Sequence, residues 1–330
     1  MLLPDFQSAL RPRGPQAGYT SDLFWFALAV SAVVLALVVG FLAAALVAHR
    51  RRAGEEEPGE RQLARAVGLA IGGTVVVLAA WLVMNVVAMR GLSASPPRAG
   101  HDPGSPLALA DSTPLVIEVQ GQQWWWEVTY DSPSPPERLT TANEIHVPVG
   151  RPVVLRLSSR DVIHSLWVPN LAGKRDLIPG HEATLRFRAD TAGIYRGQCA
   201  EFCGLQHANM ALLVVAEPPA RFVAWYAGQL RPADVPADSS RRMGQTVFAG
   251  AACSLCHTVR GTPANGRVAP DLTHVGSRQT LAAGTLPNLR GHLAGWILNP
   301  DRLKPGAHMP PTQLRPGELR ALLDYLEGLR

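Results

Sequence analysis

The run CAEFCGLQHANM, residues 199–210, concentrates side chains that bind soft metal ions. Two thiols, one imidazole, one thioether and one carboxylate lie within these twelve residues: Cys199, Cys203, His207, Met210 and Glu201. Thiolate, imidazole and thioether together favour copper over hard cations such as magnesium or calcium. The motif therefore predicts a copper site.

The number of cysteines in this loop indicates which kind of copper site is expected. A mononuclear blue-copper site has one cysteine ligand, whereas this loop carries two, four residues apart. Two thiolates can bridge two copper ions if each ion also receives a histidine. His164 is the candidate for the second histidine, because a neighbouring strand of a sandwich would bring its strand-like stretch to the loop. The alternative is a Cys199–Cys203 disulfide, which would leave the other ligand types unexplained.

A second motif, CSLCH, contains Cys253, Cys256 and His257. C-x-x-C-H is the pattern for covalent attachment of haem c, in which the thiols add to the haem and the histidine is the proximal iron ligand. Met309 is the candidate for the other axial ligand, since prolines and a glycine stiffen the loop LKPGAHMPP around it. His308 is the alternative ligand at this position.

The four cysteines of the chain are all used by these two assignments, so no structural disulfide is expected. Haem c is attached outside the cytoplasm. Residues from about 91 onward should therefore face the periplasm or the outer surface, and the membrane segments provide an independent check.

Two uncharged, strongly apolar runs, at about residues 23–48 and 66–89, each exceed the roughly 20 residues that cross a membrane. A secretory signal peptide is not expected, because the first run is too long and begins after Asp22. The segment between the runs is rich in arginine, carrying Arg50, Arg51, Arg52, Arg61 and Arg65, whereas the outer flanks carry Arg11, Arg13, Arg90 and Arg98. The positive-inside rule places this segment in the cytoplasm and both termini, with the redox domains, outside a bacterial cell membrane.

The length of 330 residues predicts several domains. Residues 1–100 should contain a transmembrane helical hairpin, and residues 107–227 should form a Greek-key β-sandwich, because short β-branched runs alternate there with proline and glycine turns. A linker is expected at 228–241, followed by an all-α domain at 242–330. The net charge of +5 is modest, and no basic stripe with interleaved aromatic residues indicates nucleic-acid binding.

Residues 115–215 resemble the copper domain of cytochrome c oxidase subunit II, on the motifs GQQWWWEVTY, HSLWVP, IPG and the cysteine loop. The resemblance implies a cupredoxin-like fold and a dinuclear copper centre, CuA, with the side-chain ligands His164, Cys199, Cys203, His207 and Met210. It further implies that Glu201 ligates through its backbone carbonyl and turns its carboxylate towards a magnesium site shared with subunit I. Trp124 would be the point of electron entry.

Residues 242–330 resemble a class I cytochrome c domain, on MGQTVFAGAACSLCHTV, APDLTHVGSR and PGAHMP. Together the two resemblances imply an oxidase subunit that passes electrons from haem c to CuA and on to subunit I, where dioxygen is reduced to water. Subunit III, membrane lipid and an upstream donor, such as cytochrome c or a quinol–cytochrome c reductase, are the other expected partners.

Two alternatives remain open from the sequence. The chain could deliver electrons to a CuA-containing nitric oxide reductase, or act as a membrane-anchored carrier without a catalytic partner. The ten histidines are scattered, which argues against nitrous oxide reductase. One departure from the family concerns the glutamate that many members carry at the start of the second span, near a proton path: here the apolar run has no acid, and only Glu60 precedes it.

Overall fold

The computed structural model describes residues 7–51, 59–93, 105–107 and 113–330. Arg52 and Arg98, two of the arginines used for the predicted membrane orientation, lie outside the described residues. The described chain divides into two compact units. One contains the two N-terminal helices from Gly18 onward, and the other contains the residues before Gly18 together with the two C-terminal domains.

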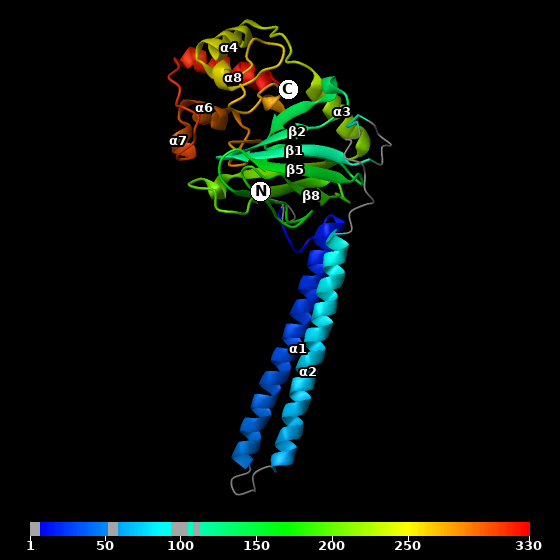
Figure 1. The fold of residues 1–330 in the computed structure, drawn as a ribbon. Helices are drawn as coiled ribbons and strands as arrows, with labels where there is room; N and C mark the ends of the chain where they lie inside the picture. Colours follow the sequence, from blue (N-terminus) through cyan, green and yellow to red (C-terminus); the bar gives the residue numbers. More distant parts are fainter. Residues whose placement is uncertain (1–6, 52–58, 94–104, 108–112) are drawn as a thin grey trace. The chain divides into compact units, whose positions relative to one another are not determined.

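The N-terminal unit is a pair of long helices, α1 (Pro15–Arg51) and α2 (Glu60–Ser93), which run side by side in Figure 1. The rings of Phe26 and Trp81 meet between them, with centroids 6.0 Å apart. Both helices are long and apolar enough to cross a membrane. Both also begin before the predicted apolar runs, and α2 carries Glu60 in its first turn.

A β-sandwich of two five-stranded sheets follows, in agreement with the predicted fold class. The first sheet has the order β3 (Leu139–Ala142), β2 (Trp125–Tyr130), β1 (Leu115–Gln122), β5 (Val153–Ser159), β8 (Ala183–Phe187). The second has the order β4 (Glu144–Pro148), β10 (Ala211–Glu217), β9 (Gly193–Cys199), β6 (His164–Trp167), β7 (Arg175–Leu177). Neighbouring strands are antiparallel except for the parallel pairs β1/β5 and β4/β10.

The core of the sandwich comes from alternating residues of these strands, as a pleated sheet with one inward face requires. Ile117, Trp126, Val128 and Leu155 are all fully or almost fully buried in it. The apolar faces of the two sheets therefore hold the loops at the sandwich ends in fixed positions.

Helix α3 (Pro219–Leu230) closes the sandwich and was not predicted from the sequence. Its Tyr226 meets Tyr130 edge to face at 5.4 Å, and its Trp225 stacks on His146 at 3.9 Å. Phe222 and Tyr226 are fully buried, so one aromatic face of the helix joins the sandwich core.

The C-terminal domain is mainly helical, as predicted, and is shown in yellow to red in Figure 1. Its helices are α4 (Ser239–Gly250), α5 (Cys253–Cys256), α6 (Arg290–Leu298), α7 (Pro300–Leu303) and α8 (Pro316–Gly328). The strands β11 (Thr280–Leu281) and β12 (Leu286–Pro287) add a short ribbon that the expectation of an all-α domain did not include. Helices α4 and α8 cross closely at Gly244, and Phe248 packs against Tyr325 with ring centroids 6.0 Å apart.

Candidate metal centre

The structure brings the predicted copper ligands together at one end of the sandwich. The Sγ atoms of Cys199 and Cys203 lie 3.7 Å apart, and His164 Nδ1 is 3.9 Å from Cys199 Sγ. On the other side, Cys203 Sγ lies 3.7 Å from His207 Nδ1 and 3.9 Å from Met210 Sδ. The arrangement is two thiols in the middle with one imidazole beside each, which fits two metal ions bridged by sulfur.

Both cysteines are free, because their sulfur separation of 3.7 Å is far longer than a disulfide bond of about 2.05 Å. Cys199, Cys203, Met210 and His164 are buried, with 3% or less of each residue exposed. Soft donors held in an apolar, enclosed site match the preference of copper. The donor set therefore fits copper.

Strand pairing explains how residues 35 positions apart meet. His164 begins β6 and Cys199 ends β9, and these strands are antiparallel neighbours with Leu166 opposite Cys199. The loop after Cys199 returns to β10, and the Cys199 N–H donates to the Met210 carbonyl at 2.8 Å. The sandwich thus fixes the ends of the ligand loop.

Asp161, which the sequence analysis did not single out, contacts the predicted ligand His164. Its Oδ1 lies 2.8 Å from His164 Nε2, so the carboxylate orients the ring and leaves Nδ1 for the metal. Burial disfavours the charged imidazole, but hydrogen bonds with Cys199 and Asp161 outweigh this effect and raise the pKa of His164. Burial by itself would raise the pKa of the Asp161 carboxyl group. The hydrogen bonds that it accepts from His164 and from backbone N–H groups outweigh burial and lower this pKa. In the sequence, the sign of this contact was the position of Asp161 three residues before His164.

The two thiols do not ionise independently. A hydrogen bond from Cys203, with further help from His164, lowers the pKa of Cys199 despite its burial. The pKa of Cys203 is raised, because it donates to the Cys199 thiolate and is itself desolvated. A bound cation would favour deprotonation of both thiols.

Trp124 lies in the tight turn between β1 and β2, and not in a strand as its sequence context indicated. The indole is 9% exposed, and its Nε1 donates to the Cys203 carbonyl at 3.0 Å. Gln123 Nε2 donates to the same carbonyl at 2.8 Å. Trp126 is fully buried, whereas Trp125 is half-buried.

Glu201 presents its backbone to the copper ligands and its side chain to solvent. The Glu201 carbonyl lies 3.2 Å from Cys199 Sγ, and its side chain is exposed. The neighbouring Phe202 and Leu205 are also exposed, at 75% and 69%.

The haem-binding motif lies on the single turn of α5. Cys253 and Cys256 are its end residues and are free thiols, and His257 follows directly. His257 Nδ1 lies 2.7 Å from the Pro270 carbonyl and acts as the donor there, which leaves Nε2 for iron. Burial lowers the pKa of His257 and so favours the neutral ring that a metal requires. These residues fit a covalently held haem.

Met309 and His308, the two candidates for the distal haem ligand, have different surroundings. Met309 is half-buried and packs against the core of the C-terminal domain. His308 is exposed, and its ring lies 5.5 Å from that of Trp124. This placement favours Met309 as the haem ligand.

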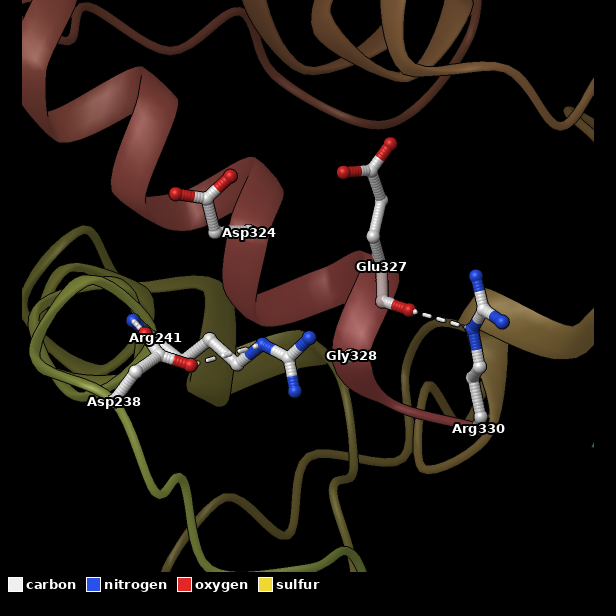
Figure 2. Close-up of a pocket in the computed structure, with 6 residues that line it drawn as sticks. All are labelled: Asp238, Arg241, Asp324, Glu327, Gly328 and Arg330. Atoms are coloured by element: carbon white, nitrogen blue, oxygen red, sulfur yellow. Dashed lines mark hydrogen bonds and ion pairs between the residues drawn. The ribbon is translucent and has the colours of Figure 1, made fainter.

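A separate pocket, shown in Figure 2, lies where the ends of α4 and α8 meet. It is lined by Asp238, Arg241, Asp324, Glu327, Gly328 and Arg330. Arg241 pairs with Asp238 at 3.3 Å, and Arg290 pairs with Asp324 at 2.7 Å. Asp238 and Asp324 are thus paired with arginines, and the pocket contains none of the predicted metal ligands.

Comparisons with known proteins agree with both domains. The family profile "Cytochrome C oxidase subunit II, periplasmic domain" matches residues 132–217, and the profile "Cytochrome c" matches residues 242–330. A cytochrome c oxidase subunit 2 from Alkalihalophilus pseudofirmus is 32% identical over 98% of this chain and 91% of its own length. A second, from Bacillus sp., is 29% identical over 98% of this chain and 92% of its own length.

A solved structure is also similar over the sandwich. The periplasmic domain of subunit II of cytochrome oxidase from Bradyrhizobium japonicum is 28% identical, with a TM-score of 0.33, and the match covers 35% of this chain and 92% of that one. The full-length similarity to the curated relatives shows the family. The chain belongs to the cytochrome c oxidase subunit II family, the copper-bearing subunit of a haem–copper oxidoreductase complex, and it ends in a cytochrome c domain.

Proposed function

We propose that this chain is the electron-transfer subunit II of a respiratory oxidase, carrying electrons from a covalent haem c to a dinuclear CuA centre and onward to subunit I for the reduction of dioxygen. The observation that carries the proposal is the pair of sulfur atoms 3.7 Å apart with one imidazole on each side. The CSLCH turn in the same chain supplies the second redox site.

The proposed copper ligands are the side chains of His164, Cys199, Cys203, His207 and Met210 and the carbonyl of Glu201. The proposed haem ligands are His257 and Met309, with thioether bonds to Cys253 and Cys256. Bound at these positions, the two groups would supply one-electron redox chemistry that no side chain of the chain provides.

The residues of the chain limit rearrangement during electron transfer. Asp161 holds the His164 ring at 2.8 Å, and the Cys199 N–H bonded to Met210 closes the ligand loop at 2.8 Å. A site fixed by paired strands changes little in geometry between oxidation states. Trp124, hydrogen-bonded to Cys203, is the proposed point of electron entry.

The exposed Glu201 and Phe202 suggest where subunit I docks. We place a shared magnesium ion at the Glu201 carboxylate and a subunit III elsewhere on subunit I.

The arginine-rich segment between α1 and α2 supports a cytoplasmic position for that segment, with both termini and the domains at 107–227 and 242–330 outside. Glu60, in the first turn of α2, is the available acid for a proton path. Cytochrome c or a quinol–cytochrome c reductase would be the upstream donor.

The decisive experiment is electron paramagnetic resonance on the purified oxidase complex, with copper and iron analysis. We expect an unpaired electron shared by two copper nuclei, and haem c that remains on this chain after denaturation. A single-copper signal would overturn the dinuclear site. Reduction of nitric oxide without oxygen consumption would identify the partner as a nitric oxide reductase, and purification without a haem-bearing partner would indicate a simple carrier.

A further inference from the structure

Two loops of the C-terminal domain, residues 278–285 and 304–308, lie directly on the copper-ligand loop of the sandwich. Backbone and side-chain hydrogen bonds join them: Ala211 N to Ala283 O at 2.9 Å, Gln206 Nε2 to Pro305 O at 2.8 Å, and Thr285 Oγ1 to Asn209 O at 3.2 Å. Each of these bonds reaches a residue within four positions of His207 or Met210. The haem domain thus contacts the metal-binding loop directly.

Lys304 lies at the centre of this contact. Its residue is 3% exposed, although lysine is almost never fully buried without partners. Its Nζ donates to three carbonyl oxygens: Trp124 at 2.8 Å, Asn209 at 2.8 Å and Ala282 at 3.0 Å. An ammonium group has three donors and no acceptor, so these carbonyls satisfy it completely.

The three acceptors come from both domains. Trp124 and Asn209 belong to the sandwich, on the entry turn and the ligand loop, whereas Ala282 belongs to the haem domain. A buried ammonium is costly unless all of its donors are bonded. Separation of the domains would break two of the three bonds, so the group stabilises only the docked arrangement.

Lys304 also begins the loop that carries the distal haem-ligand candidate. Along this loop, Gly306 has a φ of +81°, and a Cβ there would meet Leu205 at 3.1 Å and the Trp124 ring at 3.6 Å. The His308 ring then lies tilted beside Trp124, with centroids 5.5 Å apart, and Met309 packs against the core of the haem domain. The same short loop therefore touches the indole and the haem core.

The start of the 278–285 loop makes further contacts with the sandwich. Arg278 Nη2 donates to Thr141 Oγ1 at 3.2 Å, and the Gln279 N–H donates to Glu144 Oε1 at 2.6 Å. Both acceptors lie on sandwich strands β3 and β4. The same loop of the haem domain therefore contacts both the copper-ligand loop and the strands β3 and β4.

We propose that Lys304 is a positioning residue that locks the haem domain onto the CuA loop, so that the two domains form one rigid donor–acceptor pair. Because the docked haem domain covers Trp124, this ring then accepts electrons only from the fused haem domain. A soluble donor protein must deliver its electron to the haem domain. This inference rests on the proposed function for its redox consequence, but the docking itself is independent of bound metal.

The chain contains only two lysines, Lys174 and Lys304, and this permits a sharp test. Lys174 is exposed on the sandwich and serves as the internal control. In the purified oxidase treated with an amine-acetylating reagent, we expect Lys304 to react at least about tenfold more slowly than Lys174, because reaction requires local opening. Equal acetylation rates of Lys304 and Lys174 in the native complex would overturn the proposal. This outcome does not depend on whether the copper resonance is that of a dinuclear centre.

The matched variants are Lys304→Met and Lys174→Met. In Lys304→Met, we expect hydrogen exchange at the Ala211 amide, bonded across the interface, to rise at least about tenfold, while exchange at the Leu213 amide, bonded to Asn143 within the sandwich, is unchanged. Haem-to-copper electron transfer should slow, with the haem spectrum and copper resonance preserved. Lys174→Met should match the wild type. If hydrogen exchange at the Ala211 amide and the rate of electron transfer are both unchanged in Lys304→Met, the positioning role is refuted. If this variant does not assemble, the acetylation rates of the wild-type protein test the proposal instead.

Discussion

The Trp124 indole donates its Nε1–H to the carbonyl oxygen of Cys203 at 3.0 Å, and Cys203 Sγ lies 3.7 Å from Cys199 Sγ. One residue thus connects the ring at the interface with the sulfur pair of the metal site. A hydrogen bond to the ligand backbone both positions the ring and provides a short path through bonded atoms.

Trp124→Phe should slow electron transfer from haem c to copper while leaving the copper content unchanged. The Cys203 carbonyl keeps its hydrogen bond from Gln123, so the loss in unfolding free energy should be only about 1 kcal/mol. Laser-flash reduction of the haem in the complex measures the rate. Trp125→Phe, at the half-buried neighbouring ring, is the control, and equal rates in the two variants would exclude a special role for Trp124.

Asp161→Asn should weaken copper binding by roughly 10- to 100-fold, because the His164 ring loses the carboxylate that orients it. Competition with a copper chelator measures the affinity. Asp190→Asn removes an exposed carboxylate paired with Arg188 and should leave the affinity unchanged. An Asp161→Asn protein with wild-type affinity would show that His164 is positioned by the strands alone.

Met309→His should lower the midpoint potential of haem c on the order of 0.1 V or more, since thioether ligation raises the potential and axial ligands span roughly 0.8 V. Redox titration of the haem absorption band measures the shift. His308→Ala should leave the potential nearly unchanged, because the His308 side chain is exposed beside Trp124. The reverse result would make His308 the ligand.

The stability of the sandwich should depend on pH through His146. Its ring lies 3.1 Å from Glu217 and stacks on Trp225, and although burial opposes the charged form, the hydrogen bonds with Glu144 and Glu217 raise its pKa. A raised pKa in the folded state adds stability below the unfolded value of about 6.5, and this is lost as pH rises through the folded pKa.

In chemical unfolding of the full chain between pH 5 and 8, the contribution of His146 should therefore decrease the stability with rising pH, whereas that of His257, whose pKa is lowered, has the opposite sign. In His146→Gln this dependence should be smaller. A variant whose pH profile matches the wild type would assign the dependence to another group.

Gly244→Ala should destabilise the haem domain by about 3 kcal/mol or more, because a Cβ at this position would lie 2.0 Å from the Ala321 carbonyl oxygen. The crossing of α4 and α8 leaves no room for the methyl group. Gly250→Ala, in the same helix, meets nothing within 4 Å and should be neutral or slightly stabilising. Thermal unfolding followed by haem absorption compares the two, and similar midpoints would show that the crossing can widen.

The sequence by itself determined the features that reside in short, contiguous segments. The cysteine loop at 199–210, the CSLCH turn and the two apolar runs have residue types and spacings that few other structures use. Periodicity distinguished the sandwich from the helical domain, because one strand face or one helix stripe must be apolar to form a core. It could not show α3, whose aromatic face packs on Tyr130 and His146, two residues of distant strands.

Only the tertiary structure decided which distant groups meet. The pairing of β6 with β9 brings His164 and its partner Asp161 to the cysteines, and no local pattern encodes that register. Lys304 looked like an ordinary surface charge, because lysine is usually solvated. Its burial follows from three carbonyls that lie up to 180 positions away along the chain and converge only when both domains are folded and docked.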